Sequence, residues 1–101
     1  MKTAVQVTVY LNESDKWERI LQMLRSEGVA GASALHAAAG FNGRSPVHTK
    51  GLVEAGGDLP VIIVFVDFEE HVTRVLPKLF ELAPHRLIVR ENVVIEQSTL
   101  D

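Results

Sequence analysis

The chain contains no cysteine, which excludes several kinds of site at once. Without a thiol, the protein has no disulfide, no thiol nucleophile and no cysteine-ligated zinc. It also lacks an excess of basic residues, because 10 Lys and Arg against 13 Asp and Glu give a net charge of −3 at pH 7. Nucleic-acid binding depends on cations that neutralise phosphates, so we expect no nucleic-acid partner.

Long hydrophobic runs are missing as well. The longest apolar stretch, residues 59–66, is far shorter than the ~20 apolar residues that a helix needs to cross a bilayer. The first residues alternate in polarity and do not form a continuous apolar segment before a small-residue cleavage site, so no secretory signal is predicted. A cytoplasmic location is therefore the expectation.

The length and composition favour one folded domain. The 101 residues suffice for a single, modest core, and we assign residues 1–101 to one domain. Hydrophobic residues make up 47% of the chain and charged residues 23%, which is typical of a globular protein rather than a disordered one.

The first half of the chain predicts a strand, a helix and a second strand. Residues 5–11 alternate between apolar and polar side chains, as in a strand with one buried face. A helix is expected to begin at Asp15, which has capping-box spacing with Glu18, and to end at Gly28. Residues 30–39 follow as a strand of mostly small side chains.

The second half repeats this pattern in the same order. Residues 59–66 predict a strand that is apolar on both faces, and residues 68–82 predict a helix in which Pro77 causes a kink or a restart. Residues 87–95 supply the last strand, with an interruption at 91–92. The order βαββαβ predicts an α+β fold, the ferredoxin-like sandwich with an antiparallel sheet and two helices on one face.

The strand at 59–66 also predicts an oligomer. The helices cover only one face of such a sheet, so a monomer would expose the second apolar face to water. Burying a few hundred Å² of it contributes several kcal/mol at ~25 cal/mol per Å². The natural cover is another copy of the same chain, and we therefore predict a homo-oligomer whose sheets face inward.

Several segments resemble one known family. They are GVAGASALHAAAGFNGRSPVHT at 28–49, DLPVIIVFVD at 58–67 and EEHVTRVLPKL at 69–79, together with NESDK at 12–16. In combination they resemble the PII-like proteins of the family named domain of unknown function 190.

The resemblance implies a PII-like homotrimer of ferredoxin-like subunits with clefts between neighbours. In the wider PII class, adenine nucleotides occupy these clefts, and the loop after the second strand changes shape with the ligand and docks onto a partner. The stretch GFNGR at 40–44 resembles the start of that loop. The glycine-rich phosphate loop that PII proteins carry before the last strand has no counterpart at 82–86.

The main candidate ligand site lies in the loop 41–57, which is far longer than a hairpin needs. Glycines allow close backbone approach to a ligand, and cations pair with phosphate or carboxylate. The alternative is a solvated loop whose charges only keep the chain soluble. The candidate ligand-binding residues here are Gly40, Phe41, Gly43, Arg44, His48 and Lys50.

Three candidates lie outside the loop. Arg86 and Arg90 flank the last strand, where they either form the positive wall of a cleft or act as edge charges that prevent wrong strand pairing. His36 is either a buried, hydrogen-bonded residue or a residue that lines the cleft. The four histidines are scattered without a local ligand pair, so no metal site is expected.

These features together predict a signalling or regulatory homotrimer and not an enzyme. It would bind a small anionic metabolite, with an adenine nucleotide as the candidate, and the loop 41–57 would become ordered and act on a partner such as a membrane transporter or channel. Two alternatives stay open: a trimeric enzyme with a site between subunits, and a structural trimer of the divalent-metal-tolerance type.

Overall fold

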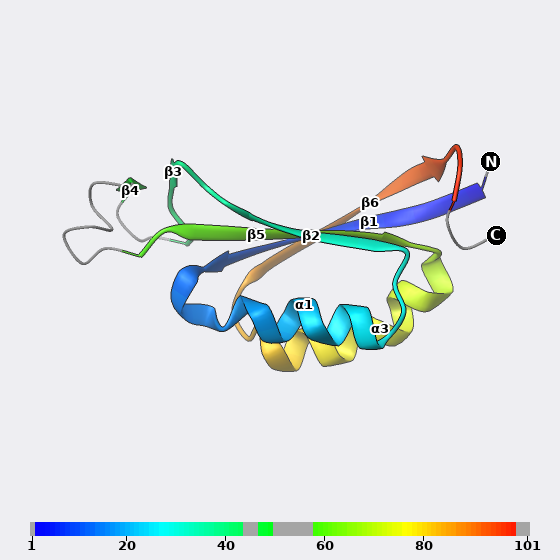
Figure 1. Cartoon of the computed structure of the whole chain (residues 1–101), viewed down its shortest axis with the longest axis horizontal. Coiled ribbons are helices and arrows are strands. Elements are labelled where there is room, and N and C mark those ends of the chain that lie inside the picture. The colour runs from blue at the N-terminus through cyan, green and yellow to red at the C-terminus, as the bar shows by residue number, and fades with distance from the viewer. Residues whose placement is uncertain (1, 44–46, 50–57, 99–101) are drawn as a thin grey trace.

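The computed structural model describes residues 2–43, 47–49 and 58–98. Its elements follow one another along the chain as shown in Figure 1. They are β1 (Lys2–Asn12), the 3-10 turn η1 (Glu13–Asp15), α1 (Trp17–Ser26), β2 (Gly31–His36), β3 (Ala39–Gly40), β4 (His48–Thr49), β5 (Pro60–Asp67), α3 (Glu69–Leu82) and β6 (Leu87–Ile95). Within these described ranges, no helix is long and apolar enough to cross a membrane.

The four long strands form one antiparallel sheet in the order β2-β5-β1-β6. Both helices lie on the same face of this sheet, which confirms the predicted ferredoxin-like sandwich (Figure 1). The short strands β3 and β4 form a separate ladder, in which Ala39 lies opposite Thr49 and Gly40 opposite His48.

The core lies between the sheet and the two helices. Alternate residues of β1 and β5 point toward the helices, and the apolar stripes of α1 and α3 meet them, as the sequence periodicities predict. The largest fully buried side chains are Phe65, Leu11, Ile20, Leu24, Ile63, Leu79, Val5, Val7, Val9, Val61, Val72 and Val75.

The opposite face of the sheet, here called the outer face, is not covered by helices (Figure 1). The strand register aligns its side chains in rows, one made of Leu35, Ile62, Tyr10 and Leu87 and the next of Ser33, Val64, Thr8 and Val89. Leu35 and Leu87 are 55% and 61% exposed, and Ile62 and Val64 are half-buried. The prediction that the strand at 59–66, now β5, is apolar on both faces is therefore confirmed.

The sequence predicted an interruption in α3 and another in β6. Helix α3 is one continuous element through Pro77, so it does not restart there; Pro77 lies on the exposed side, while the buried stripe on the opposite side holds the helix against the sheet. Strand β6 runs without a break because Glu91 and Asn92 pair with Gln6 and Val5 of β1. Tertiary pairing overrides the local sequence preference in both places.

Two predicted boundaries were also wrong. The second strand ends at His36 rather than at residue 39. The Ala37 N–H still donates to the carbonyl oxygen of Pro60 (3.0 Å), but Pro60 has no N–H to return a bond, so the pairing with β5 stops there and the chain enters β3. The helix predicted to begin at Asp15 begins at Trp17, since Lys16 has a left-handed backbone (φ 53°) that separates η1 from α1.

An ion pair between the helices provides a test by pH. The Lys78 ammonium donates a hydrogen bond to the Glu27 carboxylate and lowers the pKa of Glu27 below its ordinary value. Because the pKa of Glu27 is lower in the folded protein than in the unfolded chain, the pair stabilises the fold fully at a pH above the pKa of the unfolded chain. That contribution is lost as the pH falls through the pKa of the folded protein.

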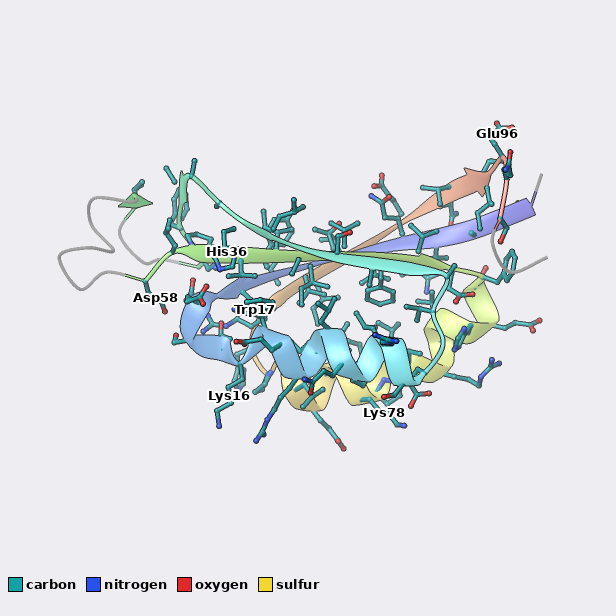
Figure 2. All side chains as sticks on the ribbon, in the orientation of Figure 1. Lys16, Trp17, His36, Asp58, Lys78 and Glu96 are labelled. Carbon is teal, nitrogen blue, oxygen red and sulfur yellow. The ribbon has the colours of Figure 1, made fainter. Side chains whose placement is uncertain are left out.

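We expect Lys78→Gln to raise the pKa of Glu27 toward its ordinary value in a titration followed by carboxyl NMR shifts. Lys16→Gln, the same charge change at a lysine that lies well away from Lys78 in Figure 2, should leave the titration unchanged, and an equal shift in both variants would contradict the assignment.

Candidate functional site

Several segments meet at the turn that follows β1, here called the 12–15 turn (Asn12, Glu13, Ser14 and Asp15). The first segment is the start of the loop 41–57, where Asn42 follows β3. The Asn42 side-chain amide donates hydrogen bonds to the carbonyl oxygen of Leu11 (2.6 Å) and to Oδ1 of Asn12 (2.7 Å). The next residue, Gly43, has a left-handed backbone (φ 62°), which glycine adopts without strain. The start of the loop is thus fixed to the end of β1.

The other end of the loop attaches to the same turn. The Ser14 hydroxyl donates to Oδ2 of Asp58 (2.5 Å), and the Glu13 N–H donates to the carbonyl oxygen of Leu59 (2.9 Å). Asp58 and Leu59 directly precede β5. The 12–15 turn therefore contacts both ends of the loop, although the turn and the loop are far apart in the sequence.

A hollow of about 760 Å³ opens beside this turn. Its apolar side is formed by Phe41, which is 58% exposed, and by two residues of the outer face. Its polar groups come from the loop start and from the turn between α3 and β6. The lining residues are Tyr10, Phe41, Asn42, Gly43, His85, Arg86 and Leu87.

Arg86 provides a guanidinium to this hollow. His85 before it has a left-handed backbone (φ 62°), so the chain turns sharply between α3 and β6. The Arg86 Nη2 lies 2.8 Å from Oδ1 of Asp15, and the two side chains are 29% and 21% exposed. A partly buried cation beside apolar and aromatic surface suits a ligand that has both an anionic and a flat apolar part.

His36, the last residue of β2, contacts the 12–15 turn rather than the hollow. Its Nε2 is 2.5 Å from the Glu13 carboxylate, and its ring meets the Trp17 ring edge to face at 5.4 Å. The Trp17 indole N–H donates to the other oxygen of Glu13 (3.3 Å). Figure 2 shows His36 above Trp17, with Asp58 at the same end of the molecule. The His36 side chain is 49% exposed, so the interpretation as a buried histidine was wrong.

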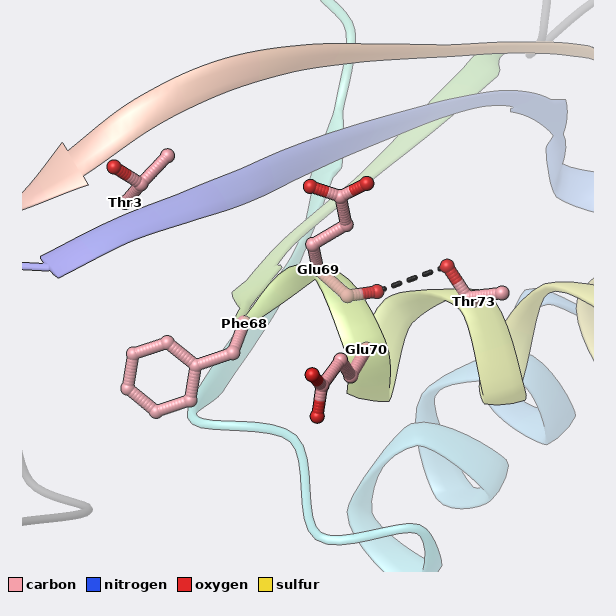
Figure 3. A pocket seen from close by; sticks show the side chains of 5 residues that line it. All are labelled: Thr3, Phe68, Glu69, Glu70 and Thr73. Carbon is pink, nitrogen blue, oxygen red and sulfur yellow. Dashed lines mark hydrogen bonds between the residues drawn. The ribbon is translucent and has the colours of Figure 1, made fainter.

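A second hollow, of about 580 Å³, lies at the start of α3 and is lined by Thr3, Phe68, Glu69, Glu70 and Thr73 (Figure 3). The Thr73 hydroxyl donates to the carbonyl oxygen of Glu69 (3.0 Å), a bond within the helix. The charged residues in its lining are the two glutamates, which repel anions. This hollow is therefore a poor site for an anionic ligand.

The predicted site residues separate into three groups. Phe41, Gly43 and Arg86 line the hollow, and His36 and Gly40 lie at the same end of the sheet. Arg90 lies elsewhere, with its guanidinium 3.7 Å from the Glu69 carboxylate. Arg44 and Lys50 lie outside the described residues, and of His48 only the backbone is described, in β4.

Several residues of the site were not identified from the sequence. They are Tyr10, Asn42, His85 and Leu87 in the lining and Asp15 behind Arg86. A signal existed for two of them, since Asn42 lies within GFNGR and Asp15 within NESDK, both among the segments that resemble the family. Among the described residues, no three His, Asp or Glu side chains gather to hold a metal ion.

Comparison with known proteins adds a family and a fold. The model of the DUF190 family, described as "Uncharacterized ACR, COG1993", matches residues 4–95. The UPF0166 protein MJ1524 of Methanocaldococcus jannaschii is 39% identical over 80 residues, which cover 73% of this chain and 73% of that protein.

Two solved structures have the same fold at low sequence identity. CPII from Thiomonas intermedia K12, bound to ADP and bicarbonate, has a TM-score of 0.70 and 18% identity, over 95% of this chain and 91% of that chain. The divalent ion tolerance protein CutA1 from Ehrlichia chaffeensis has a TM-score of 0.64 and 12% identity, over 96% and 87%. With a PII-like fold and a family match that spans nearly all of its residues, the chain belongs to the DUF190 family.

Proposed function

We propose that the protein is a PII-like signalling or regulatory homotrimer that binds a small anionic metabolite between its subunits. The observation that carries the proposal is the position of the hollow at the border of the outer face. Tyr10 and Leu87 belong to both, because they pair across β1 and β6 in one row of the outer face and also line the hollow. A second copy that covers the outer face would therefore also border the hollow.

The outer face has the apolar character that such an interface requires. Leu35, Leu87 and Val89 are 55%, 61% and 43% exposed. Complete burial of a side chain of this size contributes about 1.5–3 kcal/mol relative to full exposure. Association costs about 4–15 kcal/mol in lost freedom of motion, so several such residues per subunit are needed, and the rows of the outer face supply them.

The chemistry of the hollow favours an adenine nucleotide as the ligand. Arg86 offers a guanidinium for phosphate, and Phe41 and Tyr10 offer aromatic surface for a base. CPII, which has the same fold, has been solved with ADP, AMP and bicarbonate, and these are the natural probes. Ligand binding would order the loop 41–57, and the loop would act on a partner such as a membrane transporter or channel.

Arg86→Gln is expected to weaken binding of ADP about tenfold, because a charge-assisted hydrogen bond contributes about 1.5–3 kcal/mol. The measurement is isothermal titration calorimetry on the purified protein, after a thermal-shift comparison of ADP, AMP and bicarbonate. Arg90→Gln is the matched control, since it makes the same charge change on β6, the strand that follows Arg86, but away from the hollow.

Four results would contradict the proposal. Unchanged affinity in Arg86→Gln would remove the hollow from the site, and equal losses in both variants would indicate a general charge effect. Conversion of ADP to products would favour the trimeric enzyme. A thermal shift with divalent cations alone would favour the divalent-metal-tolerance alternative.

A further inference from the structure

A continuous chain of hydrogen bonds connects two polar residues of the hollow through the 12–15 turn. Arg86 Nη2 donates to Oδ1 of Asp15 (2.8 Å), and the Asn12 N–H donates to Oδ2 of the same carboxylate (2.7 Å). The side-chain Oδ1 of Asn12 accepts from the Asn42 amide (2.7 Å). Arg86 and Asn42 both line the hollow, and neither Asp15 nor Asn12 is among its lining residues.

We propose that Asp15 is a positioning residue for the ligand site, acting on Arg86 directly and on Asn42 through Asn12. The proposal rests on the proposed function, because it assigns a role to a residue behind the same hollow. In this arrangement, a ligand that contacts Arg86 also acts on the hydrogen bonds of Asn42, where the loop 41–57 begins. The 12–15 turn is thus the link between the hollow and the start of the loop.

Capping of the turn does not explain both bonds of Asp15. The bond from the Asn12 N–H spans three residues and satisfies a backbone donor at the start of η1, as in any cap. The bond to Arg86 spans 71 residues and reaches a different element, so the turn itself does not need it. It fixes one edge of the guanidinium and leaves the donors on its other edges for a ligand.

Two effects of Asp15 on an anionic ligand oppose each other. Its negative charge repels the anion, but this repulsion is screened because both Asp15 and Arg86 keep contact with water. Its hydrogen bond immobilises a long side chain, and a free Arg would lose substantial rotamer freedom on binding. We therefore expect the positioning effect to exceed the repulsion.

The first experiment measures ADP binding to Asp15→Asn by calorimetry. The asparagine has the same shape, but it turns an NH₂ group toward the Arg86 or Asn12 donor and so breaks one bond. We expect an affinity about tenfold weaker than that of the wild type. Glu27→Gln is the matched control, because it removes a carboxylate that is also paired with a cation but lies far from the hollow. Tighter binding by Asp15→Asn would overturn the proposal and make Asp15 a competitor of the ligand.

The second experiment needs no ligand and follows the side-chain amide resonances of Asn42 by NMR. Asp15→Asn and Asn12→Ala should each shift these resonances and speed their exchange with water, although residue 15 does not contact Asn42 directly. Glu27→Gln should leave them unchanged. Asn12→Ala removes the acceptor of Asn42 itself and shifts its resonances in any case, so if Asp15→Asn does not fold, Arg86→Gln, which removes the side-chain partner of Asp15, decides the result.

The two experiments separate the two proposals. If the wild type binds none of ADP, AMP or bicarbonate, the proposed function fails, while the response of Asn42 still decides whether Asp15 positions it. If Asn42 responds to neither Asp15→Asn nor Arg86→Gln, the positioning role is wrong, whatever the wild type binds.

Discussion

Replacing Val64 by aspartate is expected to convert the proposed homotrimer into folded monomers. Val64 lies at the centre of the outer face, between Ser33 of β2 and Thr8 of β1. A carboxylate at this position stays in water on a monomer but would be buried without a partner in the assembly, which costs several kcal/mol in each subunit. Native mass spectrometry at micromolar concentration should show the trimer for the wild type and the monomer for Val64→Asp.

Gln22→Glu adds one negative charge on the exposed side of α1 and is the control for net charge. It should leave the mass of the assembly unchanged, and circular dichroism should show that Val64→Asp keeps its fold. The same variant should lose most of its affinity for ADP, because the hollow would then be bordered by one subunit only. A wild type that is monomeric at micromolar concentration would make the homotrimer proposal wrong.

Most of the fold could be predicted because burial imposes strict periods on the sequence. The alternation in β1 and the apolar stripes of α1 and α3 each specify which face is buried, and a sheet with two helices is the fold that satisfies all of them. Residues 59–66 are apolar without alternation, which predicted a strand that is apolar on both faces. The physical constraint is strong at these positions, since an error in register would expose the whole core face.

The structure around the loop could not be predicted in the same way. Where β2 ends depends on Pro60, the residue opposite Ala37, which has no N–H to continue the pairing, and β3 depends on its partner β4. Both are contacts between distant parts of the chain, and the local sequence of small residues at 30–39 carries no signal for them. A strand made of small residues could end at any of several positions.

The site was only partly predictable for the same reason. Asp15 has the spacing of a helix cap with Glu18, and this role accounted for the residue without a distant partner. Its contact with Arg86, 71 residues away, was therefore not predicted. Asp58 and Asp67 flank β5 in the sequence, and that position alone does not indicate what they contact. Asp58 fastens the loop to Ser14, and Asp67 is the only charged or polar residue among the described ones that is buried in the core.

The second large effect is expected for Asp67→Ala, which should lower the free energy of unfolding by about 3 kcal/mol or more. Asp67 is 1% exposed and accepts three hydrogen bonds. The donors are the N–H groups of Ala30 (3.0 Å) and Phe68 (2.6 Å) and Nδ1 of His71 (2.8 Å). A buried donor left without its acceptor costs about 1–3 kcal/mol, and this one carboxylate serves the start of β2 as well as the start of α3.

The measurement is urea unfolding of Asp67→Ala in the Val64→Asp background, so that dissociation of subunits does not contribute to the transition. Asp58→Ala is the matched control, because Asp58 also accepts two hydrogen bonds, from the N–H and the hydroxyl of Ser14, but is partly exposed. Water can replace the lost acceptor at Asp58, so its cost should stay below about 1 kcal/mol. Equal losses in the two variants would show that burial does not determine the contribution of Asp67. A larger loss in Asp67→Ala would establish that this buried carboxylate, rather than apolar packing alone, joins β2 and α3 to the end of β5.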